Sequence, residues 1–235
     1  MISLRISGAL LRHQLRDPLY LATVLIAAAC ALIVRFLLPL GLTTSGLHEL
    51  SATYEVAFMS ALASTAIGLR SVIAFRPLTD RQHGPLGRLL TEALALALAS
   101  TLPAAGLIIT AHLGRSWQFG TFRMEQSLCA LAIGLCWLIA AGLSLSRIAD
   151  RGPAPLVPAL LGLLCWVLPA VAGESTGSGR AITAFLDVSR PLRTSFDSPL
   201  GLAQWSTSLL AAAGWGFLAL ASASRSGPYA LRSPR

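Results

Sequence analysis

Long apolar stretches alternate with short polar segments rich in arginine along the whole chain. A transmembrane helix needs about 20 consecutive, mostly apolar residues. On this pattern we predict an all-α membrane protein, a single transmembrane domain over residues 1–235. Its six transmembrane helices are expected at Leu19–Leu40, Tyr54–Phe75, Leu89–His112, Gln126–Leu145, Leu156–Ala172 and Leu202–Ser222. Pro103 and Pro169 fall inside the third and fifth spans, where we expect kinks.

The first 17 residues follow a different pattern. Apolar positions such as Leu4, Leu11 and Leu15 are interleaved with arginines. This pattern predicts an amphipathic helix that lies in the membrane interface, with Arg12, Arg16 and Asp17 at its end. The apolar run that follows is too long for the core of a cleavable signal peptide, so we expect it to be the first span.

Composition supports a membrane protein. Hydrophobic residues make up 54% of the chain and charged residues 12%, whereas soluble domains carry about 25% charged residues. The net charge is +8, and all 18 of the lysine-plus-arginine residues are arginines. These arginines flank apolar stretches instead of forming one patch, so they indicate membrane orientation and no nucleic-acid partner. The absence of lysine and asparagine suggests a GC-rich bacterial genome.

The distribution of arginine predicts the topology. One set of termini and loops contains eleven arginines, namely Arg5, Arg12, Arg16, Arg76, Arg81, Arg88, Arg147, Arg151, Arg225, Arg232 and Arg235. The opposite set contains five, namely Arg115, Arg123, Arg180, Arg190 and Arg193. Cytoplasmic loops carry the excess of basic residues. We therefore expect both termini in the cytoplasm, in a multi-pass protein of the bacterial inner (plasma) membrane.

Four charged residues fall within the predicted spans. Arg35 and Glu55 lie near the outer ends of the first and second spans. Arg70 and Glu92 lie near the inner ends of the second and third spans. Ionisable residues in a membrane usually face a partner or a cavity. Each of the two sets can form an ion pair, snorkel to the headgroups, or line a transport path, and the sequence leaves these alternatives open.

No motif for catalysis, cofactor binding or metal binding stands out. No histidine lies deep within a span, His48-Glu49 lacks the second histidine of a zinc motif, and a P-loop is impossible without lysine. We therefore expect a non-enzymatic protein without a cofactor. The longest outer connection, residues 172–201, begins with a Gly/Ser-rich stretch and continues with apolar residues at helical spacing. It predicts a short interfacial or re-entrant helix.

Two segments resemble one family. The sequence DRQHGPLGRLL has a charged stretch, a glycine, a leucine, a charged residue and a leucine pair in the order typical of the cytoplasmic loop of type-2 ABC exporter permeases. The residues that fill those places are Asp80, Arg81, Gly84, Leu86, Arg88, Leu89 and Leu90. Pro85 and Gly87 depart from the pattern. The sequence LLRHQLRDPLYL, residues 10–21, resembles the amphipathic N-terminal helix of the same family.

The resemblance implies a membrane subunit of an exporter. A separate cytoplasmic ABC ATPase, a P-loop NTPase, would press on residues 76–90, with the three leucines in a cleft of the ATPase and Asp80, Arg81 and Arg88 as the polar rim. The N-terminal helix would be a second contact. A second copy or a sister permease would complete the export pathway. The first, second and fifth spans would line this pathway, and the outer segment would cap its exit. Membrane lipid would surround the subunits.

Three other functions are compatible with the sequence. The first is a permease of the cytochrome c maturation type, which would share the general fold. The second is a membrane partner protein without transport activity. The third is a lipid-modifying membrane enzyme, which would need carboxylates or histidines clustered at one depth, and the sequence shows no such cluster.

Overall fold

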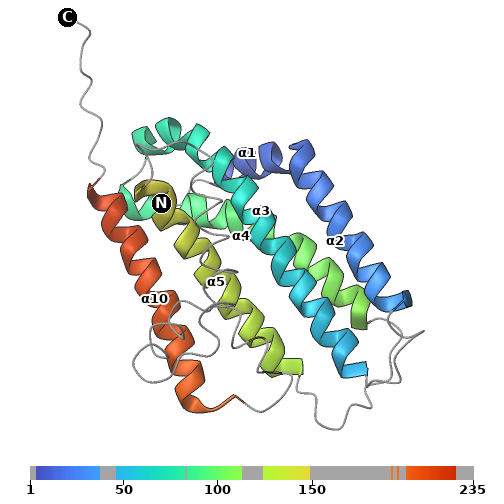
Figure 1. Ribbon diagram of the computed structural model, residues 1–235. Helices are drawn as coiled ribbons and strands as arrows, with labels where there is room; N and C mark the ends of the chain where they lie inside the picture. The colour runs from blue at the N-terminus through green and yellow to red at the C-terminus, as the bar shows by residue number, and fades with distance from the viewer. Residues whose placement is uncertain are drawn as a thin grey trace, which may run out of the picture.

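A computed structural model describes residues 4–37, 46–82, 84–112, 124–148 and 200–225, together with 192 and 195. These residues form helices without any strand. The helices are α1 (Leu4–Leu15), α2 (Pro18–Leu37), α3 (Gly46–Gln82), α4 (Pro85–His112), α5 (Met124–Ile148) and α10 (Leu202–Arg225). The long helices run side by side, while α1 lies across one end of them (Figure 1). We call this end the α1 end.

The helical class expected from the sequence is confirmed, and four helices are long and apolar enough to cross a membrane. These candidate spans are Ser51–Arg76, Pro85–Ile109, Met124–Arg147 and Leu202–Ser224. A fifth candidate arises if α1 and α2, bent by 67° relative to each other, are counted as one span. The predicted span at 156–172 lies outside the described residues, and the cytoplasmic placement of both termini stays a prediction.

The segment expected to be a cytoplasmic loop is largely helical. The candidate span ends at Arg76, close to the expected Phe75, but in place of a loop over residues 76–90 α3 continues to Gln82 and α4 starts at Pro85. The carbonyl of Gly84 accepts a hydrogen bond from the amide of Arg88 at 3.0 Å, so Gly84 is the N-cap of α4. Pro85 then occupies the first helical position, where a missing N–H costs nothing. The place of Pro85 at the start of α4 gives a structural reason for a proline where the family pattern has another residue.

The junction of α1 and α2 is built in a similar way. The carboxylate of Asp17 accepts a hydrogen bond from the amide of Leu19 at 2.9 Å, and Pro18 is the first residue of α2. Asp17 is therefore the N-cap of α2, a role in which an aspartate satisfies an otherwise unpaired helical donor. The Asp-Pro pair noted in the sequence thus has a local structural function.

Helix α4 continues through Pro103. Because proline has no N–H, the carbonyl of Ala99 loses the donor that an ordinary residue at position 103 would provide. The hydroxyl of Tyr20 donates a hydrogen bond to that carbonyl at 2.8 Å. Both Tyr20 and Ala99 are buried. Helix α2 therefore supplies the hydrogen bond that the proline removes from α4.

Small residues at the helix contacts allow close approach in a membrane. Ala57, Ala61 and Ala99 are fully buried between α3 and its neighbours. On the other side of the bundle, Trp137 of α5 meets Trp215 of α10 edge to face, with ring centroids 5.7 Å apart. The hydroxyl of Ser144 also donates to the carbonyl of Trp215. The core thus extends across α3, α4, α5 and α10.

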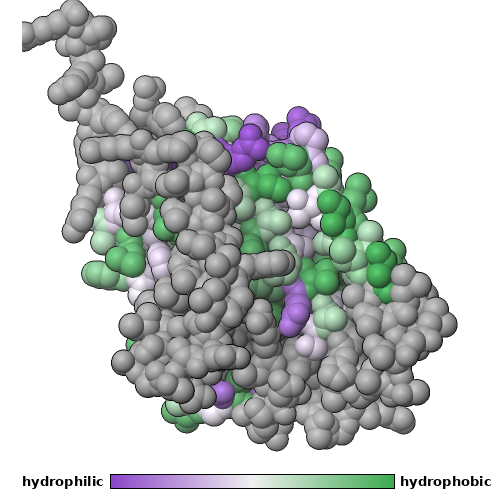
Figure 2. Space-filling view, in the orientation of Figure 1, coloured by the Kyte–Doolittle hydropathy of each residue, from purple (hydrophilic) through white to green (hydrophobic). Residues whose placement is uncertain are grey.

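Two helices expose much of their apolar surface. Leu25 and Ile26 of α2 are exposed, as are Leu210 and Phe217 of α10. Only 17% of the span in α10 is buried, against 50–67% for the other three candidate spans. Figure 2 shows apolar residues along α2 and hydrophilic residues at the α1 end. Such apolar faces suit contact with lipid or with another membrane helix.

Most of the predicted outer segment, 172–201, lies outside the described residues. Leu192 and Ser195 are described, and both are buried in helical conformation. The hydroxyl of Ser195 lies 3.0 Å from that of Ser127, near the start of α5. Ser195 therefore contacts the end of the bundle opposite to the α1 end.

Candidate functional site

The α1 end brings together the two segments that resemble exporter permeases. Helix α1 contacts both α3 and α4. The hydroxyl of Ser7 donates to the carbonyl of Thr91 in α4 at 3.2 Å, and the amide of Gln14 donates to the carbonyl of Gly68 in α3 at 3.2 Å. His13 is held from two sides, by a hydrogen bond to Ser71 and by an edge contact with the ring of Phe75. Helix α1 is therefore fixed to the bundle.

Gly68 is required where α1, α3 and α4 meet. A Cβ atom at this position would lie 2.7 Å from a methyl group of Leu96 and 3.0 Å from the side-chain nitrogen of Gln14. Leu96 and Gln14 are fully buried, so neither has free space to move into. The absence of a side chain at Gly68 thus allows Gln14 to reach its backbone acceptor.

Two arginines near this end bind the ends of other helices. The guanidinium of Arg76 in α3 donates to the carbonyl and the hydroxyl of Ser146, at 3.2 and 2.9 Å. That of Arg88 in α4 donates to the carbonyl of Ala223 at 3.2 Å. Both acceptor carbonyls lie in the last turn of their helices, where backbone oxygens lack intrahelical partners and cations are favoured. These arginines therefore link α3 to α5 and α4 to α10.

A buried ion pair completes the polar layer at this end. Arg147 of α5 and Glu92 of α4 are 2.8 Å apart, with side-chain exposures of 3% and 0%. The buried charged residues in the described part of the chain are this pair, Arg76 and Arg88. One carboxylate thus accompanies three guanidinium groups. Removing one partner of a buried pair costs about 3–5 kcal/mol, so Glu92 is expected to be essential for this layer.

The predicted ATPase-contact residues divide into exposed and buried groups. Leu86 and Leu90, one turn apart in α4, are 56% and 41% exposed. Leu89 packs against the core, and Arg88 is only 5% exposed. The prediction that Arg88 forms a polar rim was therefore wrong, because its charge is used inside the bundle.

The remaining residues of this segment are placed by their backbone alone. Asp80 and Arg81 belong to the last turn of α3, with side chains outside the described set. Gly84 has open space around it. Arg12 and Arg16 are exposed on α1. Leu86, Leu90 and the two arginines of α1 thus form the exposed part of the predicted contact.

Three of the four predicted intramembrane charges have described side chains. Glu92 is bound to Arg147, a partner that the sequence reasoning did not name, while Arg70 is exposed on α3. Glu55 is also exposed. Arg35 lies in α2 with its side chain outside the described set, so the predicted Arg35–Glu55 pair stays a prediction.

The roles of Arg76 and Arg147 were missed because both were counted as orientation charges in cytoplasmic loops. A signal for the ion pair was nevertheless present. Glu92 begins one predicted span from the inner side, and Arg147 follows the inner end of the next span. Adjacent antiparallel spans bring such positions to the same depth. Matching charges by depth between neighbouring spans would have identified the pair.

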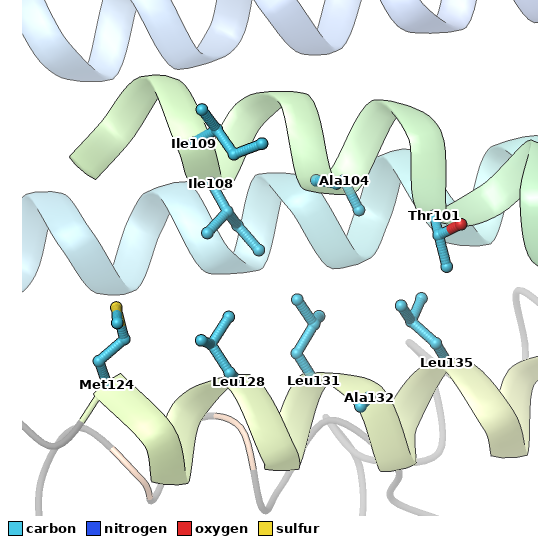
Figure 3. Close-up of a pocket in the computed structure, with 10 residues that line it drawn as sticks. Thr101, Ala104, Ile108, Ile109, Met124, Leu128, Leu131, Ala132 and Leu135 are labelled. Atoms are coloured by element: carbon cyan, nitrogen blue, oxygen red, sulfur yellow. The ribbon is translucent and has the colours of Figure 1, made fainter. Parts of the chain in front are cut away.

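An apolar cleft lies between α4 and α5, away from the polar layer. Its volume is about 550 Å³. Side chains of the two helices face one another across it, with Thr101, Ala104 and Ile108 on one side and Leu128 and Leu131 on the other (Figure 3). The small side chain of Ala104 opposite leucines leaves part of this space open. The cleft can hold an apolar group, and it offers almost no polar atom for binding.

Comparison with known proteins gives no match to this chain, whether with protein-family models, curated proteins or solved structures.

Proposed function

We propose that this chain is the membrane-spanning subunit of an ABC exporter in the bacterial inner membrane. The observation that carries the proposal is the convergence of α1 and the 84–90 segment at one end of an apolar helical bundle. Both segments resemble parts of type-2 ABC permeases, and they are separated by about 70 residues in the chain. The bond from Ser7 to Thr91 joins α1 to α4 one residue beyond the 84–90 segment.

A partner that closes on ATP can act mechanically on this end. Leu86 and Leu90 present an exposed apolar surface suited to a cleft of the ATPase, and the arginines of α1 provide a basic border. The next turns of α4 carry Arg88 and Glu92, which hold α10 and α5. A push on the start of α4 is thus transmitted to two further helices through buried charged contacts. ATP hydrolysis is the task of the ATPase chain.

The cargo proposed for this exporter is lipid-like or amphipathic. The apolar cleft between α4 and α5 and the exposed apolar faces of α2 and α10 support this choice, because each can contact hydrocarbon. The faces of α2 and α10 also provide surfaces for a second permease copy or a sister chain. In this arrangement the α1 end and both termini face the cytoplasm, as the arginine distribution predicts.

The test is a pull-down of the tagged protein from its own host in mild detergent, followed by mass spectrometry. The variant L86D/L90D places two charges on the exposed surface and leaves the core residue Leu89 intact. The matched control is L202D, because Leu202 is 88% exposed at the opposite end of the bundle. We expect an ABC ATPase to co-purify with the wild type and with L202D, but not with L86D/L90D.

Two results would contradict the proposal. If no ATPase accompanies the wild-type chain, the resemblance is accidental and a membrane partner without transport activity becomes the better explanation. If the ATPase remains bound to L86D/L90D at the wild-type level, the contact lies elsewhere. Far-UV circular dichroism and the elution volume of each variant show whether the fold is preserved.

A further inference from the structure

A polar pocket of about 490 Å³ lies at the elbow between α1 and α2. Its lining comes from two helices and the junction between α1 and α2, chiefly Arg12 and His13 of α1, Arg16 and Asp17 of the junction, and Phe75 of α3. The hydrogen bond of His13 to Ser71 and its contact with Phe75 fix one wall. The wall formed by His13 and Phe75 is therefore part of the packed fold, while Arg12 and Arg16 are exposed at the rim.

The charge of this pocket favours an anion. Two guanidinium groups face one carboxylate, and that carboxylate already accepts the amide of Leu19 as the cap of α2. Arginine binds phosphate oxygens through a planar fork of parallel N–H donors. A phosphate group is thus the ligand chemistry that fits the lining best.

The position of the pocket indicates where such a phosphate would come from. With about 100° per residue, Arg5 and Arg12 fall within about 20° of one another on α1, on the side away from the buried Leu10, and Arg16 follows in the turn after Leu15. Between this stripe and the buried face lie Leu4 and Leu15, which are exposed. Such an amphipathic helix lies at the depth of the headgroups.

The exposed apolar residues at the start of α2 also indicate that the pocket lies at the depth of the headgroups. Leu19, Leu21 and Leu25 are exposed immediately beyond the pocket. Figure 2 shows the transition from hydrophilic residues over α1 to apolar residues along α2. The mouth of the pocket therefore lies between a water-facing basic surface and a lipid-facing apolar surface, where phospholipid phosphates are found.

We propose that the elbow pocket binds the phosphate of an anionic phospholipid headgroup, with Arg12 and Arg16 as its ligands. The acyl chains of the bound lipid lie along the exposed leucines of α2. Bound in this way, the lipid holds the bend between α1 and α2. The inference goes beyond the exporter function and does not depend on an ATPase partner.

The test is native mass spectrometry of the delipidated full chain, titrated with phosphatidylglycerol or with zwitterionic phosphatidylcholine. We expect phosphatidylglycerol to bind more tightly. An arginine near an anionic headgroup contributes roughly a fivefold gain in affinity, so R12Q/R16Q should raise the apparent Kd for phosphatidylglycerol roughly 25-fold. The control R5Q removes a charge from the same stripe but outside the pocket, and it should retain the tight site.

Further variants keep the test decisive. If R12Q/R16Q does not fold, R12K/R16K preserves the charge without the fork and should weaken phosphatidylglycerol binding severalfold. D17N removes the carboxylate but keeps a capping oxygen, so it should strengthen binding. An inorganic phosphate titration, followed by thermal unfolding, distinguishes a free anion from a headgroup. Stabilisation by inorganic phosphate that needs both arginines, without preference for phosphatidylglycerol, would assign the site to free phosphate.

Two results would overturn the proposal. Equal weakening per removed charge, roughly fivefold by R5Q and 25-fold by R12Q/R16Q, would show attraction to diffuse charge and no specific pocket. Unchanged lipid binding by R12Q/R16Q, with loss of the ATPase in the pull-down, would assign these arginines to the protein partner.

Discussion

The hydrogen bond from Tyr20 to Ala99 gives the sharpest prediction, because the acceptor depends on a proline one turn away. In the wild type the hydroxyl of Tyr20 donates to the carbonyl of Ala99 at 2.8 Å. Pro103 cannot provide the usual helical N–H to that carbonyl. Tyr20→Phe therefore leaves a fully buried carbonyl without a donor, at a cost of about 1–3 kcal/mol. A loss of about 2 kcal/mol reduces the ratio of folded to unfolded protein roughly 30-fold.

A second substitution tests the cause. In a Pro103→Ala background the new backbone N–H can bond to the carbonyl of Ala99, so Tyr20→Phe should then cost only about 0.5–1 kcal/mol. The double-mutant cycle should give a coupling free energy of about 1–2 kcal/mol, within the range seen for contacting residues. The free energy of unfolding is measured by SDS titration in mixed micelles, with far-UV circular dichroism as the signal.

Thr23→Val is the matched control. The hydroxyl of Thr23 donates to the carbonyl of Leu19, which already receives the amide of Thr23 within the helix. Its loss should change stability by no more than about 0.5 kcal/mol. If Tyr20→Phe costs the same whether residue 103 is proline or alanine, the reasoning is refuted.

Three further predictions use the same unfolding assay. Glu92→Gln should cost about 3–5 kcal/mol, because it removes the carboxylate that binds the buried guanidinium of Arg147; an unchanged free energy of unfolding would contradict this account. Gly68→Ala should destabilise by about 1–3 kcal/mol through overpacking at α1, whereas Gly106→Ala, with open space around it, should be neutral or stabilising. Asp17→Ala should cost about 1 kcal/mol and Asp17→Asn much less, since asparagine also caps helices; a similar loss for both would argue against the cap.

The sequence predicted those features that depend on local pattern. Alternation of leucine and arginine located α1, and long apolar runs located the helices from α2 to α5 as well as α10. The Asp-Pro pair marked the junction at residue 17. Each of these signals comes from residues close together in the chain, so a single sequence is enough to read them.

Features that depend on contact between distant segments were not predicted. Arg76 and Arg88 were interpreted as water-facing because cytoplasmic loops are rich in arginine, yet both are buried. Their acceptors lie 70 and 135 residues further along the chain, at the ends of α5 and α10. Nor does hydropathy distinguish a polar helix end from a loop, and this is why residues 76–82 were expected to be a loop although α3 continues to Gln82.

The arginine contacts also impose an order on biogenesis. During synthesis α3 and α4 are made before α5 and α10, so neither Arg76 nor Arg88 can reach these acceptors until the later helix has followed. Only when the end of α10 arrives can Arg88 reach the carbonyl of Ala223. A chain truncated before α10 would therefore lack the contact that joins the start of α4 to the end of α10.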